Sequence, residues 1–184
     1  MSGHALAASI VFNINLSDAV GVKESTRSVR ICYKFAKLGA KGAVMKFVCD
    51  GPNGTTWFRV ETEAEAEQEP ALMEHAVAKH FRRAMDAATA SYKPTSSVYI
   101  EQNIGLAAHL QKASPLFLTL RENDGTALVT AMLPPQGEKQ PGFRIIIVGA
   151  KNGNPYNCHQ DAIAALSRHF GLTLDRADCF PYAG

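Results

Sequence analysis

The sequence has few cysteines, no long apolar run and little excess charge of either sign. The 4 cysteines form no CxxC pair, and none has a histidine at the spacing of metal ligands, so we expect no metal site and a reduced, cytoplasmic protein. The apolar stretch at 5–12 is short, follows no positive charge and is soon broken by Asn13. It therefore predicts neither a signal peptide nor a membrane span. Nothing in the sequence indicates a cofactor.

The net charge of +2 comes from 19 basic and 17 acidic residues and is too small to predict binding to nucleic acid or to a membrane by itself. Its distribution is uneven. Residues 1–60 carry more cations than anions, whereas residues 61–74 contain a run of glutamates. The two segments together predict a dipolar molecule.

Two β-hairpins are predicted by their turns. Strands at 43–50 and 55–61 flank a Gly-Pro-Asn-Gly turn, and strands at 116–122 and 126–133 flank Asn123-Asp-Gly125. Alternating or continuous apolar residues predict further strands at 10–16, 29–35, 98–100 and 145–148. The last of these is apolar on both faces, which is typical of a central strand.

Apolar residues at helical spacing predict the helices. We expect one helix from Pro70 to about Tyr92, a short one over 104–110, and a last one from Asn154-Pro155 to Gly171. The proline-rich segment 134–142 predicts a mobile surface loop.

The fold class predicted from these elements is α+β: an antiparallel sheet built from β-hairpins, with two principal helices covering one side. A length of 184 residues with 46% hydrophobic residues suits a single domain covering 1–184. Both halves, 1–92 and 97–184, fit a β-x-β-β-β-α order, so a pseudo-duplicated arrangement stays open.

A basic sheet face is the first candidate site. Alternation in the strand at 29–35 places Arg30 and Lys34 on one face, and Lys46 or Arg59 would extend it, with Trp57 as a stacking platform. Such a surface is typical of binding to a nucleic-acid backbone or an acidic protein. The competing interpretation is an ordinary solvent-facing sheet side, because exposed strands carry Lys and Arg to prevent edge pairing.

The second candidate is the connection between the strand at 145–148 and the last helix. Its glycines, Gly149 and Gly153, allow close backbone approach, Lys151 supplies charge, and the helix start near His159 supplies N–H donors for an anion. The segment fails the Walker pattern, because Gly153 is not followed by Lys-Ser/Thr. The competing interpretation is a tight strand-to-helix turn.

Cys158 lies in the first turn of the same helix, where the helix dipole favours a thiolate. His159 is a poor general base for it, because adjacent side chains on a helix point about 100° apart. A nucleophilic Cys158 would need a histidine from elsewhere. The competing interpretation is a small buried cysteine.

These observations give three functional hypotheses. The first is a non-catalytic module that binds nucleic acid or an acidic protein through the basic sheet face. The second is a small enzyme or an anion- or nucleotide-binding protein that uses residues 149–159. The third is an assembly or regulatory subunit that binds other proteins, with homo-oligomerisation left open.

Overall fold

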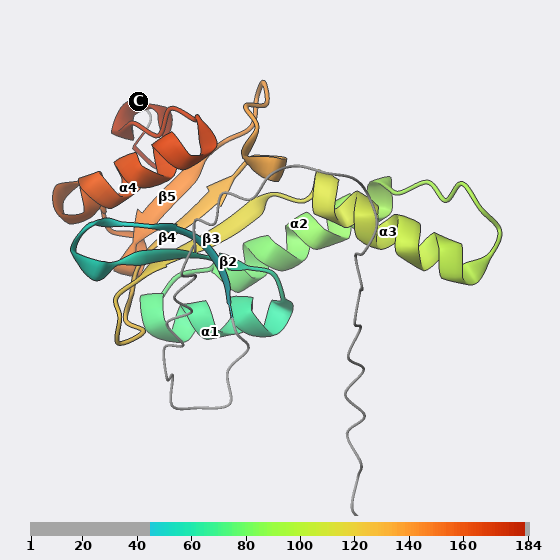
Figure 1. Cartoon of the computed structure of the whole chain (residues 1–184), viewed down its shortest axis with the longest axis horizontal. Helices are drawn as coiled ribbons and strands as arrows, with labels where there is room; N and C mark the ends of the chain where they lie inside the picture. The colour runs from blue at the N-terminus through green and yellow to red at the C-terminus, as the bar shows by residue number, and fades with distance from the viewer. Residues whose placement is uncertain (1–44, 183–184) are drawn as a thin grey trace, which may run out of the picture. The chain divides into compact units, whose positions relative to one another are not determined.

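The computed structural model describes residues 45–182, which form one antiparallel sheet with helices on both of its faces (Figure 1). The expected strands at 10–16 and 29–35, with Arg30 and Lys34, lie outside the described residues. Within them, the α+β class with an antiparallel sheet built from hairpins is confirmed.

The sheet has five strands in the order β1-β2-β3-β4-β5, and every neighbouring pair is antiparallel. The strands follow the chain in sequence: β1 (Lys46–Asp50), β2 (Thr56–Val60), β3 (Leu116–Arg121), β4 (Ala127–Leu133) and β5 (Ile146–Gly149). The hairpins β1–β2 and β3–β4 are the two that the turns predicted.

β3 is the strand buried on both faces, since all six of its residues are buried. Leu118 and Leu120 belong to one apolar cluster with α4 (Tyr156–Phe170). Phe117, on the other side of the strand, packs in a second cluster with α2 (Val77–Ser91).

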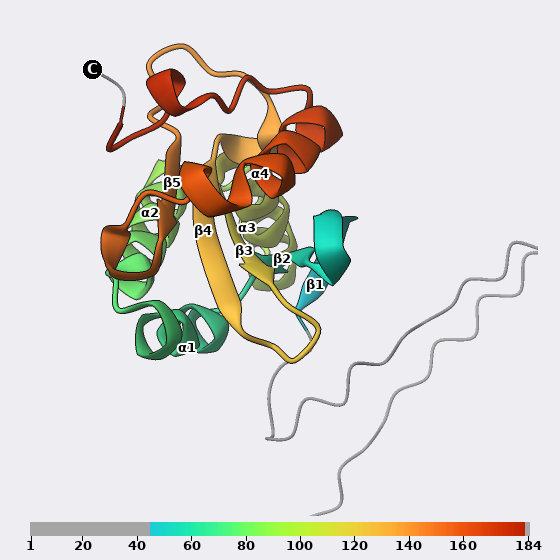
Figure 2. The ribbon, with the colours of Figure 1, turned by 90° about the vertical axis from the view of Figure 1, so that its left-hand side faces the viewer.

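The two long helices predicted from the sequence therefore lie on opposite faces of the sheet, not on one side (Figures 1 and 2). The physical reason is the side-chain alternation of a strand that is apolar in both directions, because each face then needs its own cover. α1 (Glu63–Met73) contacts α2 and β4, on the same face as α2.

The residues predicted as one helix from Pro70 to Tyr92 belong to two helices, the end of α1 and all of α2. The glutamate run forms most of α1. Thr62 begins α1 with a capping box, in which its hydroxyl accepts from the Glu65 N–H at 3.2 Å and the Glu65 carboxylate accepts from the Thr62 N–H at 3.0 Å. Glu74, with φ 53° in the left-handed region, ends α1. Pro70 lies inside α1 and is not its first residue.

The residues predicted as a strand at 98–100 begin a helix, α3 (Tyr99–Ala113), which also includes the predicted helix 104–110. The second half therefore has no strand before β3 and does not follow the β-x-β-β-β-α order. α3 lies beside α2 and not on the sheet (Figure 1).

The residues predicted as a central strand at 145–148 form β5, which is an edge strand. The C-terminal segment covers its outer side: the Phe180 N–H donates to Ile145 O at 2.8 Å, and the Ile147 N–H donates to Phe180 O at 3.2 Å. The helices and this C-terminal segment cover β5, which explains why its residues are apolar on both faces although the strand is not central in the sheet.

The proline-rich segment 134–142 is packed along its first part. Pro135 and Gly137 are buried, and the ring of Phe170 lies where a side chain at position 137 would project. Gly137 also has φ 74°, so this turn requires glycine for both reasons.

Candidate functional site

The structure brings together two of the predicted basic-face residues. Lys46 on β1 and Arg59 on β2 are direct partners in the sheet register. Both approach Glu61, whose carboxylate lies 3.5 Å from Lys46 Nζ and 3.4 Å from Arg59 Nε. The Lys46 side chain is 58% exposed and that of Arg59 is 23% exposed, so the pair borders solvent, although Glu61 offsets part of its charge.

Trp57 is not part of any exposed surface. Its exposure is 0%, and its indole Nε1–H donates to the carbonyl of Ala162 on α4 at 3.0 Å. Trp57 pairs with Leu120 in the register and lies under α4, so the predicted role as a stacking platform is wrong. No pattern in the sequence indicated that α4 would cover this side of β2.

The predicted anion site at Gly149, Lys151 and Gly153 is a short turn between β5 and α4 whose glycine N–H groups are already used. The Gly149 N–H donates to Gly153 O at 2.8 Å, and the Gly153 N–H donates to Ala150 O at 2.9 Å. Lys151 Nζ lies 3.5 Å from Glu74 Oε1 in an exposed ion pair. These contacts describe the tight strand-to-helix turn that was the competing interpretation.

The helix start beside this turn also satisfies part of its own backbone. The Tyr156 N–H donates to Asn154 Oδ1 at 3.0 Å, and the N–H groups of Cys158 and His159 donate to Pro155 O at 3.2 and 2.8 Å. Cys158 is exposed, so the buried-cysteine interpretation is wrong for this residue. Among the cysteines in residues 45–182, Cys179 is the fully buried one, and burial raises the pKa of its thiol.

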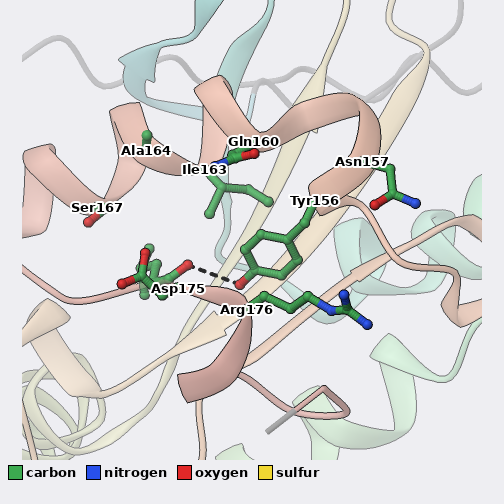
Figure 3. A pocket seen from close by; sticks show the side chains of 9 residues that line it. Tyr156, Asn157, Gln160, Ile163, Ala164, Ser167, Asp175 and Arg176 are labelled. Atoms are coloured by element: carbon green, nitrogen blue, oxygen red, sulfur yellow. Dashed lines mark hydrogen bonds between the residues drawn. The ribbon is translucent and has the colours of Figure 1, made fainter.

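A groove of about 310 Å³ runs between α4 and the chain at 174–176 (Figure 3). Asn157 and Gln160 on α4 and Asp175 opposite them line it with polar groups. At its base, the Tyr156 hydroxyl donates to Leu174 O at 3.0 Å, and burial raises the pKa of this phenol well above its usual range. The hydroxyl is therefore a structural hydrogen-bond donor.

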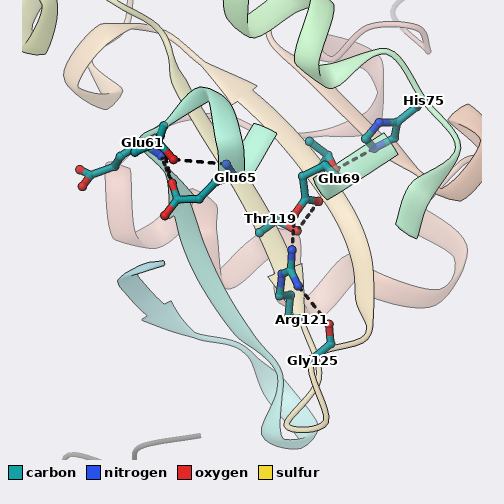
Figure 4. Close-up of polar contacts among 9 residues, drawn as sticks. Glu61, Glu65, Glu69, His75, Thr119, Arg121 and Gly125 are labelled. Atoms are coloured by element: carbon teal, nitrogen blue, oxygen red, sulfur yellow. Dashed lines mark hydrogen bonds and ion pairs between the residues drawn. The ribbon is translucent and has the colours of Figure 1, made fainter. Parts of the chain in front are cut away.

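A buried polar cluster lies on the other face of the sheet, and sequence reasoning missed it (Figure 4). Glu69 on α1 is 0% exposed, accepts a hydrogen bond from Thr119 Oγ1 at 3.0 Å and forms an ion pair with Arg121 on β3. Arg121 also donates to Gly125 O at 3.2 Å. The sequence signal that could have indicated this cluster is the side-chain alternation in β3, which places Thr119 and Arg121 on the same face as Phe117.

His75 extends this cluster from the junction of α1 and α2. It is 8% exposed, and its Nε2 lies 2.8 Å from the hydroxyl of Thr130 on β4. Burial lowers the pKa of His75, while the charge of Glu69 opposes that change, so the site favours the neutral imidazole. Its Nδ1 is buried and has no hydrogen-bond partner within residues 45–182.

α3 presents the largest group of exposed apolar side chains in the described part of the chain. It buries none of its own residues. Its contact with α2 includes the Tyr92 hydroxyl, which donates to Gln102 O at 3.2 Å, and the tilted rings of Tyr92 and His109. The exposed residues are Val98 at 51%, Tyr99 at 75%, Ile100 at 69% and Ile104 at 65%.

Comparison of the chain with protein-family models, with curated proteins and with solved structures found no match. Among residues 45–182, no helix is long and apolar enough to cross a membrane. Within the same range, no three His, Cys, Asp or Glu side chains gather in a way that suits a metal ion.

Proposed function

We propose that this protein is a non-catalytic binding module that attaches to a partner protein through the apolar face of α3. The observation that carries the proposal is the exposure of Tyr99, Ile100 and Ile104, each at least 65% exposed on a helix with no buried residue. Contiguous exposed apolar side chains mark interaction sites in soluble proteins.

The spacing on α3 suits helix docking. Ile100 and Ile104 are one turn apart, and the exposed Ala107 and Ala108 continue the same side of the helix. A stripe at i, i+4 and i+7 or i+8 is the pattern by which an amphipathic helix enters an apolar groove of a partner. Covering one such isoleucine contributes about 1.5–3 kcal/mol.

The experiment compares Ile104→Glu with Lys112→Glu, a charge change near the other end of the same helix. Both positions are exposed, so circular dichroism and thermal unfolding should match the wild type for both variants. Sedimentation velocity over a range of concentrations first tests association with a second copy. We expect Ile104→Glu, and not Lys112→Glu, to reduce any association.

If the wild type is a monomer at all concentrations, the same three proteins serve as baits in an extract of the source cells. Proteins captured by the wild type and by Lys112→Glu, and lost with Ile104→Glu, are the expected result. Capture that is indifferent to Ile104→Glu, together with a monomer in sedimentation, contradicts the proposal.

The basic sheet face is a second candidate, favoured by the direct register pairing of Lys46 with Arg59. Its ligand would be nucleic acid or an acidic protein surface. Without Trp57, that face offers charge and no stacking, so binding should fall steeply with salt and show little base preference. The double variant Lys46→Glu/Arg59→Glu should abolish it, and salt-independent binding would exclude this surface.

A further inference from the structure

A cavity of about 200 Å³ lies where the start of α2, the strands β3 to β5 and the C-terminal segment meet. It is distinct from the exposed face of α3. Its walls are mainly apolar and come from segments far apart in the sequence: Val77, Phe117, Met132, Ile146, Val148 and Phe180. Five segments of the chain therefore line one apolar space, which is open to solvent on one side, where Phe180 is 41% exposed.

The volume suits a molecule of one or two rings. A dry apolar protein cavity of about 150 Å³ is large enough to hold benzene. The present cavity is somewhat larger, and the side chains of its wall are held in place by the sheet and by α2. Apolar cavities of this kind bind ligands by removing apolar surface from water.

The polar side of the cavity is formed by His75 and Thr130, which are hydrogen-bonded to each other at 2.8 Å. Glu69 and Arg121 lie behind them and neutralise each other in their ion pair. None of the described residues that line the cavity is Asp, Glu, Lys or Arg. Exposed His80 and Asn152 are the other polar residues of the lining, so the wall offers hydrogen bonds but no carboxylate, lysine or arginine.

From this lining we propose that the cavity binds a small, uncharged, mainly apolar molecule of one or two rings, with His75 and Thr130 on its polar side. A carboxylate or an ammonium group placed among these apolar side chains would lose hydration, and no charged residue in the lining would replace it, which is unfavourable. The proposed ligand class therefore includes aromatic alcohols and excludes aromatic acids of the same size.

The first test titrates the full chain with benzyl alcohol and, separately, with benzoate at pH 7.5, following backbone amide signals by NMR. We expect saturable shifts at Val77, Thr130 and Val148 with benzyl alcohol, and at least tenfold weaker binding of benzoate. Equal or tighter binding of benzoate overturns the proposed ligand class. No saturable shift with either compound overturns the site.

A variant pair locates the binding. Ala76 lines the cavity and is exposed, so Ala76→Phe should fill the space without disturbing the core. Ala87→Phe places the same ring at an exposed position on the same helix, away from the cavity lining. We expect Ala76→Phe to weaken benzyl alcohol binding at least tenfold and Ala87→Phe to change it less than twofold.

The amide spectra of both variants also report whether the fold is retained. If Ala76→Phe disturbs the spectrum beyond its neighbours, Val148→Met, which extends into the cavity from β5, takes its place. Undiminished binding in a folded cavity variant overturns the assignment. These outcomes do not depend on the proposed role of α3, because the Ile104→Glu variant should bind benzyl alcohol like the wild type.

Discussion

The carboxylate of Glu69 on α1 forms an ion pair with the guanidinium of Arg121 on β3, with the Glu69 side chain wholly removed from solvent. Thr119 donates to the second carboxylate oxygen. A charge pair with these partners holds α1 in place on the sheet. Either ion left alone there would be strongly unfavourable, because a buried charge needs a partner.

We therefore expect Arg121→Met to destabilise the protein by about 3–5 kcal/mol, because Glu69 stays buried without its partner. The double variant Glu69→Leu/Arg121→Met should recover most of that loss. Urea unfolding of the wild type, the single variant and the double variant measures these changes in the free energy of unfolding. Arg82→Met is the control, since Arg82 pairs with Glu63 and Glu67 at the surface, and its loss should have little effect. Equal effects of the two arginine variants would argue against a buried pair.

Protonation of His75 should destabilise the fold. Burial lowers its pKa below the value of about 6.5 in an unfolded chain. Between those two values the unfolded chain binds more protons than the folded one, so stability falls as the pH drops from 6.5 through the folded pKa.

The measurement is the free energy of unfolding at pH 7.5 and pH 5 for the wild type and for His75→Gln, whose amide can still reach Thr130. We expect the free energy of unfolding to fall less between pH 7.5 and pH 5 in His75→Gln than in the wild type. An identical loss in both proteins would show that other groups cause the pH dependence.

Trp57 is the single tryptophan of the chain, so the intrinsic indole fluorescence reports on one buried site. We expect weak quenching by acrylamide in the native protein and strong quenching after unfolding. Trp57→Phe removes the hydrogen bond to Ala162 and part of the ring volume, and should cost about 1–3 kcal/mol. Strong quenching in the native state would contradict the packing of α4 over β2.

Two of the cysteines should be alkylated at different rates in the native protein. Cys158 is exposed and Cys179 is fully buried with a raised pKa, so iodoacetamide should modify Cys158 in the native protein and reach Cys179 only on unfolding. Mass spectrometry of digested samples taken over time measures both rates. Comparable native rates would show that the segment over Cys179 opens readily.

Local signals in the sequence were sufficient for the hairpins and for the end of α4. The turn at Asn123-Asp-Gly125 and the left-handed Gly171 specify their elements through backbone geometry alone. The break at Glu74 was missed, because a left-handed glutamate has no compositional mark. Val98 to Ile100 are apolar and β-prone, yet they begin α3 without being buried.

The site residues were harder to predict, because their roles depend on which face each helix covers. Lys46 and Arg59 meet as the hairpin requires, whereas Trp57 on the same strand is covered by α4. In the sequence, Glu69 is one member of the glutamate run at 61–74, and no pattern marks His75 as buried. Only the packing of α1 on β3 and β4 brings them to Arg121 and Thr130.

The pairing of Phe180 with β5 has a consequence for solubility. An open strand edge is a template on which another chain can add a strand, and here the main chain at Phe180 occupies the hydrogen-bonding positions of Ile145 and Ile147. The last residues of the described chain thus block the addition of another strand on that side of the sheet. Cleavage before Cys179 would leave this edge of the sheet free to pair with a strand of another chain.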